Sequence, residues 1–159
     1  MYKTILISLL STLFIGCSST NALKYFETDD IQARAVQHTK KADILNNKNE
    51  QKALVWATYL NNIKHSDVNK KEETFLVSLY FVDNKESFEK DDYKLTLNGK
   101  SPISMTKIDK DNAKYNSILN NNPWADKYLV KFERMKRVYD LTLELSKDGT
   151  SSAQLKFEK

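Results

Sequence analysis

The fold of this chain is decided by residues 74–82, which read TFLVSLYFV. Successive side chains of a β-strand point to opposite faces of the sheet. Both sets are apolar here: one is Phe75, Val77, Leu79 and Phe81, and the other is Leu76, Tyr80 and Val82. A strand that is apolar on both faces has to be covered from both sides, so we expect it in the middle of a sheet.

Shorter segments on either side of this strand repeat the two-residue period. Residues 53–61 place Trp56 on one apolar face and Val55 and Tyr59 on the other, and we expect Trp56 in the core. The same alternation runs through Tyr93-Leu95-Leu97, Tyr128-Val130-Phe132, Tyr139-Leu141-Leu143-Leu145 and Ala153-Leu155-Phe157. The last two segments flank a polar loop, which predicts a C-terminal hairpin with one buried face.

A tight turn is expected after the segment that ends at Leu97. Asn98-Gly99 follows it, and both residue types tolerate the positive φ angles of a two-residue hairpin turn. Pro102 then begins the expected return strand, which continues through Ile103 and Met105. Proline has no backbone N–H, a loss that the start of a strand tolerates.

Two segments are less regular. In residues 31–46, Ile31, Ala33 and Ala35 alternate, which predicts a first strand running to about Leu45, with a short helix as the alternative. Residues 109–126 are long for a loop of a compact domain, so we expect either a short helix or a function there. The apolar residues suited to a brief amphipathic turn in that segment are Ala113, Tyr115, Ile118 and Leu119.

Trp124 stands near the end of this long segment. It is either an exposed aromatic anchor for a partner or a plug at one end of the β domain. We take Trp124 and Tyr115 as the candidate partner contacts.

These segments predict an all-β fold. Seven or eight short strands with turn signals between them suit an antiparallel two-sheet, immunoglobulin-like sandwich over residues 31–159. The Cys…Trp…Cys pattern of antibody domains is absent from the sequence, so the likeness is one of architecture. A closed barrel is the alternative.

The N-terminus has the pattern of a signal peptide at residues 1–16. Lys3 supplies a positive charge, and the apolar run from Ile5 to Ile15 is too short to span a bilayer. Leu13-Phe14-Ile15-Gly16-Cys17 resembles the lipobox of bacterial lipoproteins, with Phe14 in place of the usual leucine. The resemblance implies that Cys17 is acylated and that two or three acyl chains anchor the mature chain, with residues 17–30 as a tether. A secretory signal without lipid, or an uncleaved buried helix, is the alternative.

The same resemblance implies a location. Ser18 stands where an aspartate would retain a lipoprotein in the inner membrane of enteric bacteria, so the outer membrane is expected. Cys17 is the single cysteine of the chain, so the domain has no disulfide and must be stabilised by burial.

Several segments look like strands of small lipoproteins of the Campylobacter and Helicobacter group. They are Thr39-Lys40-Lys41-Ala42-Asp43-Ile44, Lys52-Ala53, Ala57-Thr58-Tyr59-Leu60-Asn61 and Tyr128-Leu129-Val130-Lys131-Phe132. The resemblance implies a variant immunoglobulin fold at the cell envelope, and it brings no catalytic residue with it.

The sequence contains no recognisable pattern for chemistry. His38 and His65 lie far apart, without a second ligand at metal spacing. No Gly-x-Ser-x-Gly turn is present, and three glycines provide no phosphate-binding loop. The formal net charge of +4 comes from mixed charges, as in Lys70-Lys71-Glu72-Glu73, so we expect a solvated surface and no nucleic-acid partner.

We therefore expect no enzyme, metal or cofactor. The leading hypothesis is a non-enzymatic binding or adhesion module, anchored by lipid on Cys17, with a protein partner at the envelope or on a host surface. The alternative is a structural or assembly accessory of an envelope complex. A cleft that holds His38 or His65 against a carboxylate and a serine or lysine would instead indicate an enzyme.

Overall fold

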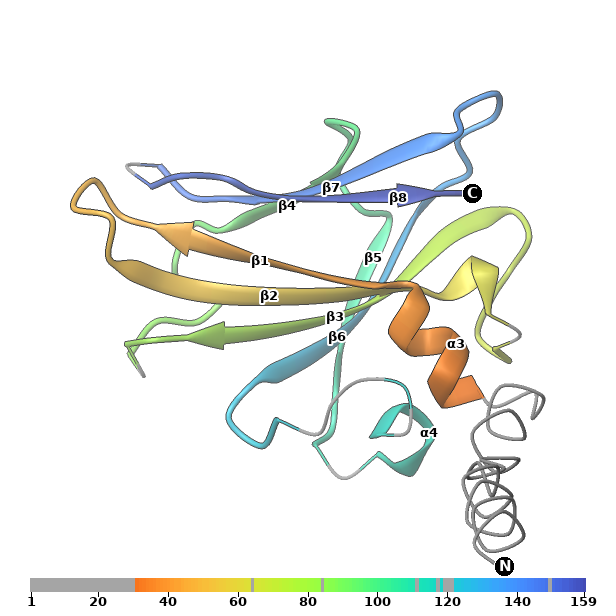
Figure 1. Cartoon of the computed structure of the whole chain (residues 1–159), viewed down its shortest axis with the longest axis horizontal. Helices are drawn as coiled ribbons and strands as arrows, with labels where there is room; N and C mark the ends of the chain where they lie inside the picture. The colour runs from red at the N-terminus through yellow and green to blue at the C-terminus, as the bar shows by residue number, and fades with distance from the viewer. Residues whose placement is uncertain are drawn as a thin grey trace, which may run out of the picture. The chain divides into compact units, whose positions relative to one another are not determined.

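The computed structural model describes residues 31–63, 65–83, 85–110, 112–116, 118, 122–148 and 150–159. The predicted signal peptide, the tether and Cys17 lie outside these residues. Within the described part of the chain, eight strands form two antiparallel sheets of five and three strands (Figure 1). The all-β prediction is thus confirmed, and there are two sheets and no closed barrel among these residues.

The larger sheet has the order β1-β2-β3-β6-β5. Its strands are β1 (Thr39–Leu45), β2 (Gln51–Tyr59), β3 (Glu72–Phe81), β5 (Ser104–Ile108) and β6 (Asp126–Glu133). The strand that is apolar on both faces, β3, lies in the middle of this sheet, as its sequence predicts.

The smaller sheet has the order β4-β7-β8. Its strands are β4 (Lys94–Leu97), β7 (Asp140–Ser146) and β8 (Ala153–Glu158). β7 and β8 form the predicted C-terminal hairpin, with Leu143 opposite Leu155. Tyr139 does not join the apolar face that it was expected to begin, because it precedes β7 and is 79% exposed.

The main core lies between the two sheets. The predicted inward set of β3 is buried there, with Phe75 fully inaccessible to solvent. The ring centroid of Phe75 lies 4.9 Å from that of Tyr59 on β2 and 5.2 Å from that of Phe157 on β8. Aromatic contacts thus join the two sheets directly.

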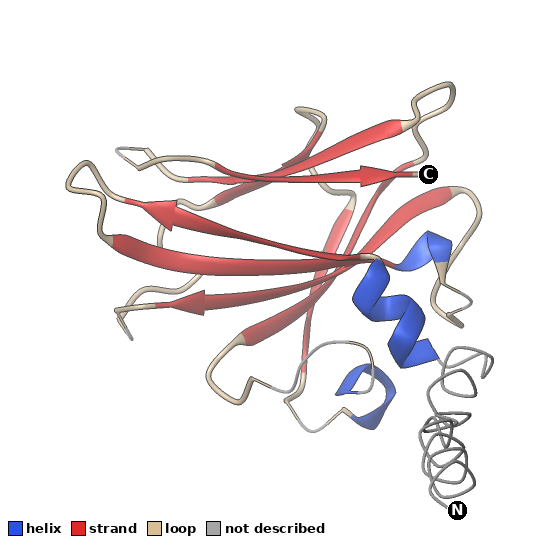
Figure 2. Ribbon diagram, in the orientation of Figure 1, coloured by secondary structure: helices blue, strands red, loops and turns tan. Residues whose placement is uncertain are grey.

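A second apolar cluster covers the outer face of the larger sheet. Leu76, which points away from the main core, packs there with Ala35, Leu60 and Ile118. The covering elements are α3 (Ile31–Gln37), η2 (Leu60–Asn62) and α4 (Ala113–Asn116), whose helices are blue in Figure 2. Trp56 packs against this outer cluster and is partly buried. It does not lie in the main core between the two sheets.

Residues 31–46 contain both of the expected alternatives. They form α3 followed at once by β1. Ile31 and Ala35 are four residues apart, so a helix brings both onto the outer cluster. The Thr39 hydroxyl donates to the Ala35 carbonyl at 2.6 Å and so links the helix end to the strand.

The hairpin predicted at Asn98-Gly99 is correct as a turn and wrong as a strand pairing. The φ angles are +47° and +78°, and Leu97 and Lys100 exchange two backbone hydrogen bonds. Beyond that turn β4 pairs with β7, whereas β5 pairs with β6 in the other sheet. Asn98 is tied to β7 through Thr142, and Pro102 has no N–H to extend a ladder on β4.

Gly99 offers a direct test of the turn. A Cβ added at Gly99 would meet nothing within 4 Å, so Gly99→Ala introduces no steric clash with other residues. The substitution should destabilise the fold only because alanine disfavours a φ of +78°. We expect a loss of about 1–2 kcal/mol in the free energy of unfolding, measured by urea denaturation. Gly99→Asn should lose less, because asparagine tolerates this conformation. Equal stability of Gly99→Ala and the wild type would contradict the assignment.

Candidate functional site

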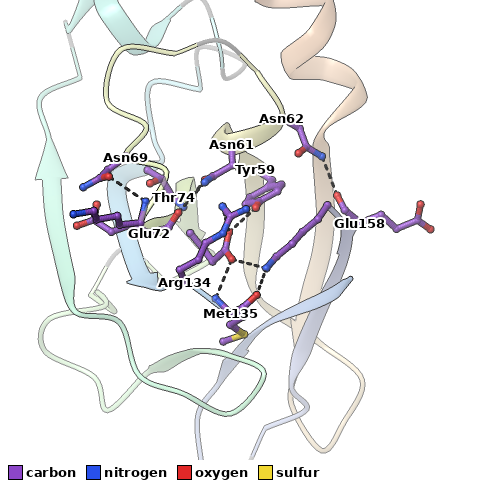
Figure 3. Close-up of polar contacts among 12 residues, drawn as sticks. Tyr59, Asn61, Asn62, Asn69, Glu72, Thr74, Arg134, Met135 and Glu158 are labelled. Atoms are coloured by element: carbon purple, nitrogen blue, oxygen red, sulfur yellow. Dashed lines mark hydrogen bonds and ion pairs between the residues drawn. The ribbon is translucent and has the colours of Figure 1, made fainter. Parts of the chain in front are cut away.

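A buried carboxylate organises one end of the main core. Glu73 has no solvent exposure and accepts hydrogen bonds from the Tyr59 hydroxyl at 2.6 Å and the Met135 amide at 3.1 Å. It also pairs with two cations: Lys159 Nζ lies 2.6 Å from Glu73 Oε1, and Arg134 Nη1 lies 3.2 Å from Oε2 (Figure 3). The carboxylate therefore has a donor or counter-charge on both oxygens, as a buried charge requires.

Four separate parts of the chain supply this cluster. Tyr59 ends β2, Glu73 is the second residue of β3, Arg134 and Met135 follow β6, and Lys159 follows β8. Burial raises the pKa of the Tyr59 phenol, and its hydrogen bond to Glu73 raises it further, so the phenol stays protonated as a donor. The cluster ties both sheets together at this end of the domain.

Two asparagines hold η2 against the strands. The Asn61 side chain donates to the Glu72 carbonyl at 2.8 Å and accepts from the Thr74 amide at 2.7 Å. Asn62 donates to the Glu158 carbonyl at 2.9 Å (Figure 3). Because both amides are committed to backbone groups, η2 is fixed to β3 on one side and to β8 on the other.

A cleft of about 630 Å³ lies over this cluster. Its lining residues are Arg34, Tyr59, Asn61, Asn62, Ile63, His65, Val68, Lys70, Arg134 and Lys159. Four of them carry a cationic side chain and none carries a carboxylate. The cleft is therefore basic, with Glu73 beneath it.

His65 lies in one wall of the cleft and is nearly buried, with its side chain 4% exposed. Its Nδ1 accepts the Asp67 backbone N–H at 3.3 Å, and its ring stacks on Tyr115 at 5.5 Å between centroids. The Tyr115 hydroxyl donates to Asp67, which also pairs with Lys114 Nζ at 2.6 Å. This group joins the segment after η2 to α4.

The histidines do not complete a catalytic group among the described residues. His65 Nδ1 accepts the Asp67 backbone N–H and lies 3.6 Å from Asp67 Oδ2, so the ring does not donate a hydrogen bond to that carboxylate as a triad histidine donates to its aspartate. No bond joins the imidazole to Lys70, and no serine, threonine or cysteine lines the cleft in this part of the chain. His38 lines a smaller pocket that adjoins the cleft.

The two candidate partner contacts have different surroundings. Tyr115 is 6% exposed and belongs to the outer cluster, whereas Trp124 is 75% exposed. The interpretation of Trp124 as a plug is therefore wrong. Its turn is well defined: the Trp124 amide donates to Asn122 Oδ1 at 3.0 Å, and Lys110 Nζ donates to the Pro123 carbonyl at 2.8 Å.

Sequence reasoning missed the Glu73 cluster. The run Lys70-Lys71-Glu72-Glu73 reads as mixed surface charge, yet Glu73 is buried. One signal was available: Glu73 is in phase with Phe75 and Val77, and so it stands on the inward face of β3. No pattern identifies Arg134 or Lys159 as its partners.

Comparisons with known proteins bring no relative to this site. No family model, curated protein or solved structure matches the chain. The described residues contain no group of three or more histidine, cysteine, aspartate or glutamate side chains that could hold a metal ion. In the same part of the chain, no helix is long and apolar enough to cross a bilayer.

Glu73→Gln tests the buried cluster. Removing the carboxylate charge leaves Lys159 and Arg134 without their counter-ion, so we expect a loss of about 3–5 kcal/mol in unfolding free energy. The matched control is Glu133→Gln, because Glu133 is 72% exposed in its pair with Lys100 and should change stability by less than about 1 kcal/mol. Similar losses in both variants, measured by denaturant titration, would contradict the assigned role of Glu73.

The surroundings of His65 predict how the free energy of unfolding depends on pH. Burial lowers the pKa of its imidazole below the ordinary 6.5; Asp67 opposes this effect and Lys114 adds to it. The folded state therefore disfavours protonation, so its stability is complete above pH 6.5 and falls as the pH drops below that value.

The measurement is the free energy of unfolding between pH 7.5 and about pH 5, a window in which histidine titrates before the carboxylates. His65→Gln should flatten this dependence, and His38→Gln should preserve it. An unchanged slope in His65→Gln would show that another group is responsible.

Proposed function

We propose that this protein is a non-enzymatic binding module of the bacterial cell envelope, held at the outer membrane by lipid on Cys17. The ligand surface is the edge strand β5 together with Trp124, and the partner is a protein at the envelope or on a host surface. The exposed indole of Trp124, in the turn just before β6, the neighbour of the edge strand β5, is the observation that carries the proposal.

The strand order supports an immunoglobulin-like fold. Constant-type immunoglobulin domains place strands A, B, E and D in one sheet and C, F and G in the other. The orders β2-β3-β6-β5 and β4-β7-β8 follow the same succession if β2 is taken as strand A, which leaves β1 as an additional edge strand. Domains of this architecture present their loops and edge strands to partners.

The edge formed by β5 is suited to contact. Within the described chain β5 has a single hydrogen-bonded neighbour, β6, and most of its residues are partly or fully exposed. Ile103, immediately before β5, is 53% exposed, and Trp124 lies on the connection that follows the strand. An unpaired strand edge can accept a partner strand, and an exposed tryptophan is a frequent hot spot of an interface.

The proposed anchor leaves the domain freedom to reach such a partner. Residues 17–30 separate the acylated cysteine from α3, and a chain of that length spans at most roughly 50 Å when extended. Two or three acyl chains at Cys17 would hold it stably at the bilayer.

Crosslinking of the lipidated protein in native membranes, followed by pull-down, tests the surface. Trp124→Ala should weaken binding by about thirtyfold, the effect of losing a hot spot worth about 2 kcal/mol, and reduce the yield of the partner accordingly. Tyr139→Ala removes another exposed aromatic side chain and should leave the yield unchanged. Both variants should unfold like the wild type. Equal yields from both would remove the case for Trp124, and a stoichiometric membrane partner retained by both would favour the assembly-accessory hypothesis.

Cys17→Ala is the companion control for the anchor. This variant should stay unlipidated and leave the membrane fraction, and mass spectrometry of the wild type should show acyl chains on Cys17. A bare thiol at Cys17 in the mature wild-type protein would refute the anchor.

A further inference from the structure

A second surface, which does not include Trp124, gathers positive charge. The cleft beside Glu73 adjoins a smaller pocket of about 400 Å³, and the two share Asn62 and Lys159. We name the surface over both pockets the basic face; its cationic side chains are Lys40, Lys70, Arg134, Lys156 and Lys159. Arg34 also lines the larger cleft and has a partner of its own, so it is left out of the charge count.

The basic face has an uncompensated charge. Its five cations outnumber the two side-chain carboxylates beside them, Glu73 beneath the cleft and Glu158 in the smaller pocket. Lys40, Lys70 and Lys156 are exposed, and no ion pair joins them to a carboxylate of the described residues. Positive side chains are thus in excess on this surface.

Two of the cations are already held in place. Glu73 fixes Lys159 and Arg134 from below, and its contact occupies one nitrogen of an Arg134 guanidinium that has five N–H donors. Asn62, which lines both pockets, is held to β8 by its hydrogen bond to the Glu158 carbonyl. Side chains that are ordered before binding lose less entropy when a ligand arrives.

We infer that the basic face binds a phosphate group. Phosphate presents several charged oxygens, which suits the planar fork of Arg134 together with separate lysine ammonium groups. A cleft of about 630 Å³ leaves room for the organic part of a phosphorylated ligand. α3, the first described element after the proposed tether, lies against the cleft through Arg34, which favours the headgroup of an anionic phospholipid over a soluble phosphate.

This inference does not depend on Trp124. The phosphate site itself is also independent of lipidation, and only the choice of a lipid headgroup as the source rests on the proposed anchor. The soluble and the membrane probes therefore have to be tested separately.

Residue-level labelling with an amine-reactive ester provides the test, using the full chain and mass spectrometry to follow each lysine. Inorganic pyrophosphate is the soluble probe, with the protein in a neutral detergent. At about ten times its Kd it should slow the labelling of Lys70 and Lys156 by about tenfold, because labelling requires the unoccupied form.

In the membrane arm, vesicles of phosphatidylcholine with phosphatidylglycerol are compared with vesicles of phosphatidylcholine alone. Salt at about 1 M should remove the protection in both arms, since the Debye length is then about 3 Å.

Lys85 and Lys90 are the internal controls. They are exposed and follow the end of β3 opposite to Glu73, from which Phe81 lies roughly 26 Å along the strand, and their labelling should not change. The variant Lys70→Glu/Lys156→Glu should abolish the protection of Lys40, whereas Lys85→Glu/Lys90→Glu, with the same change in net charge, should retain it.

The outcomes separate the sources. Protection by pyrophosphate and by the anionic vesicles supports a lipid headgroup, and protection by pyrophosphate alone supports a soluble phosphorylated ligand. The inference is overturned if neither probe protects the basic face, or if Lys85 and Lys90 are protected to the same extent.

Discussion

The strand β3 has to be covered on both faces, and the rest of the domain provides the two covers. The smaller sheet closes over Phe75 and Val77, and α3, η2 and Ile118 close over Leu76. Burial of these side chains is the main favourable contribution that a chain without disulfides has available. The short helices are therefore structural parts of the fold, and the cleft exists because α3 and η2 are held at the edge of the outer cover.

Glu73 lies at the start of this apolar strand, at one end of the main core. A carboxylate in phase with the core is costly unless it is paired and hydrogen-bonded, and here Lys159, Arg134, Tyr59 and Met135 meet that condition. Its contacts join the ends of β2, β6 and β8, which belong to both sheets. The same contacts fix the position of two cations at the base of the basic face, so a structural requirement of the core also shapes a surface.

The alternation of residues such as Phe75 and Leu76 was enough to predict the strands, the central place of β3 and the C-terminal hairpin, because the two-residue period is a local property. The partner of each strand is not local. Asn98 and Gly99 predict their own φ angles correctly, but Thr142, more than forty residues away, decides which sheet β4 joins.

The candidate site was less accessible to sequence reasoning for the same reason. Glu73 could have been suspected from its phase with Phe75, but Arg134 and Lys159 reach it through tertiary structure alone. The exposure of Trp124 likewise depends on a turn that Asn122 and Lys110 build.

The contact between the first strand and the loop before the last strand has a consequence for how the chain folds. Leu45 and Ser151 exchange hydrogen bonds across 106 positions in the sequence. Contacts of such range form late, because the whole domain has to be present before the two segments can meet. Apart from these bonds, the outer edge of β1 is unpaired among the described residues of the folded domain as well, and an unpaired edge is a template for pairing with another copy of the chain. Lys40, Lys41 and Asp43, exposed along β1, place charge on that edge and oppose aggregation.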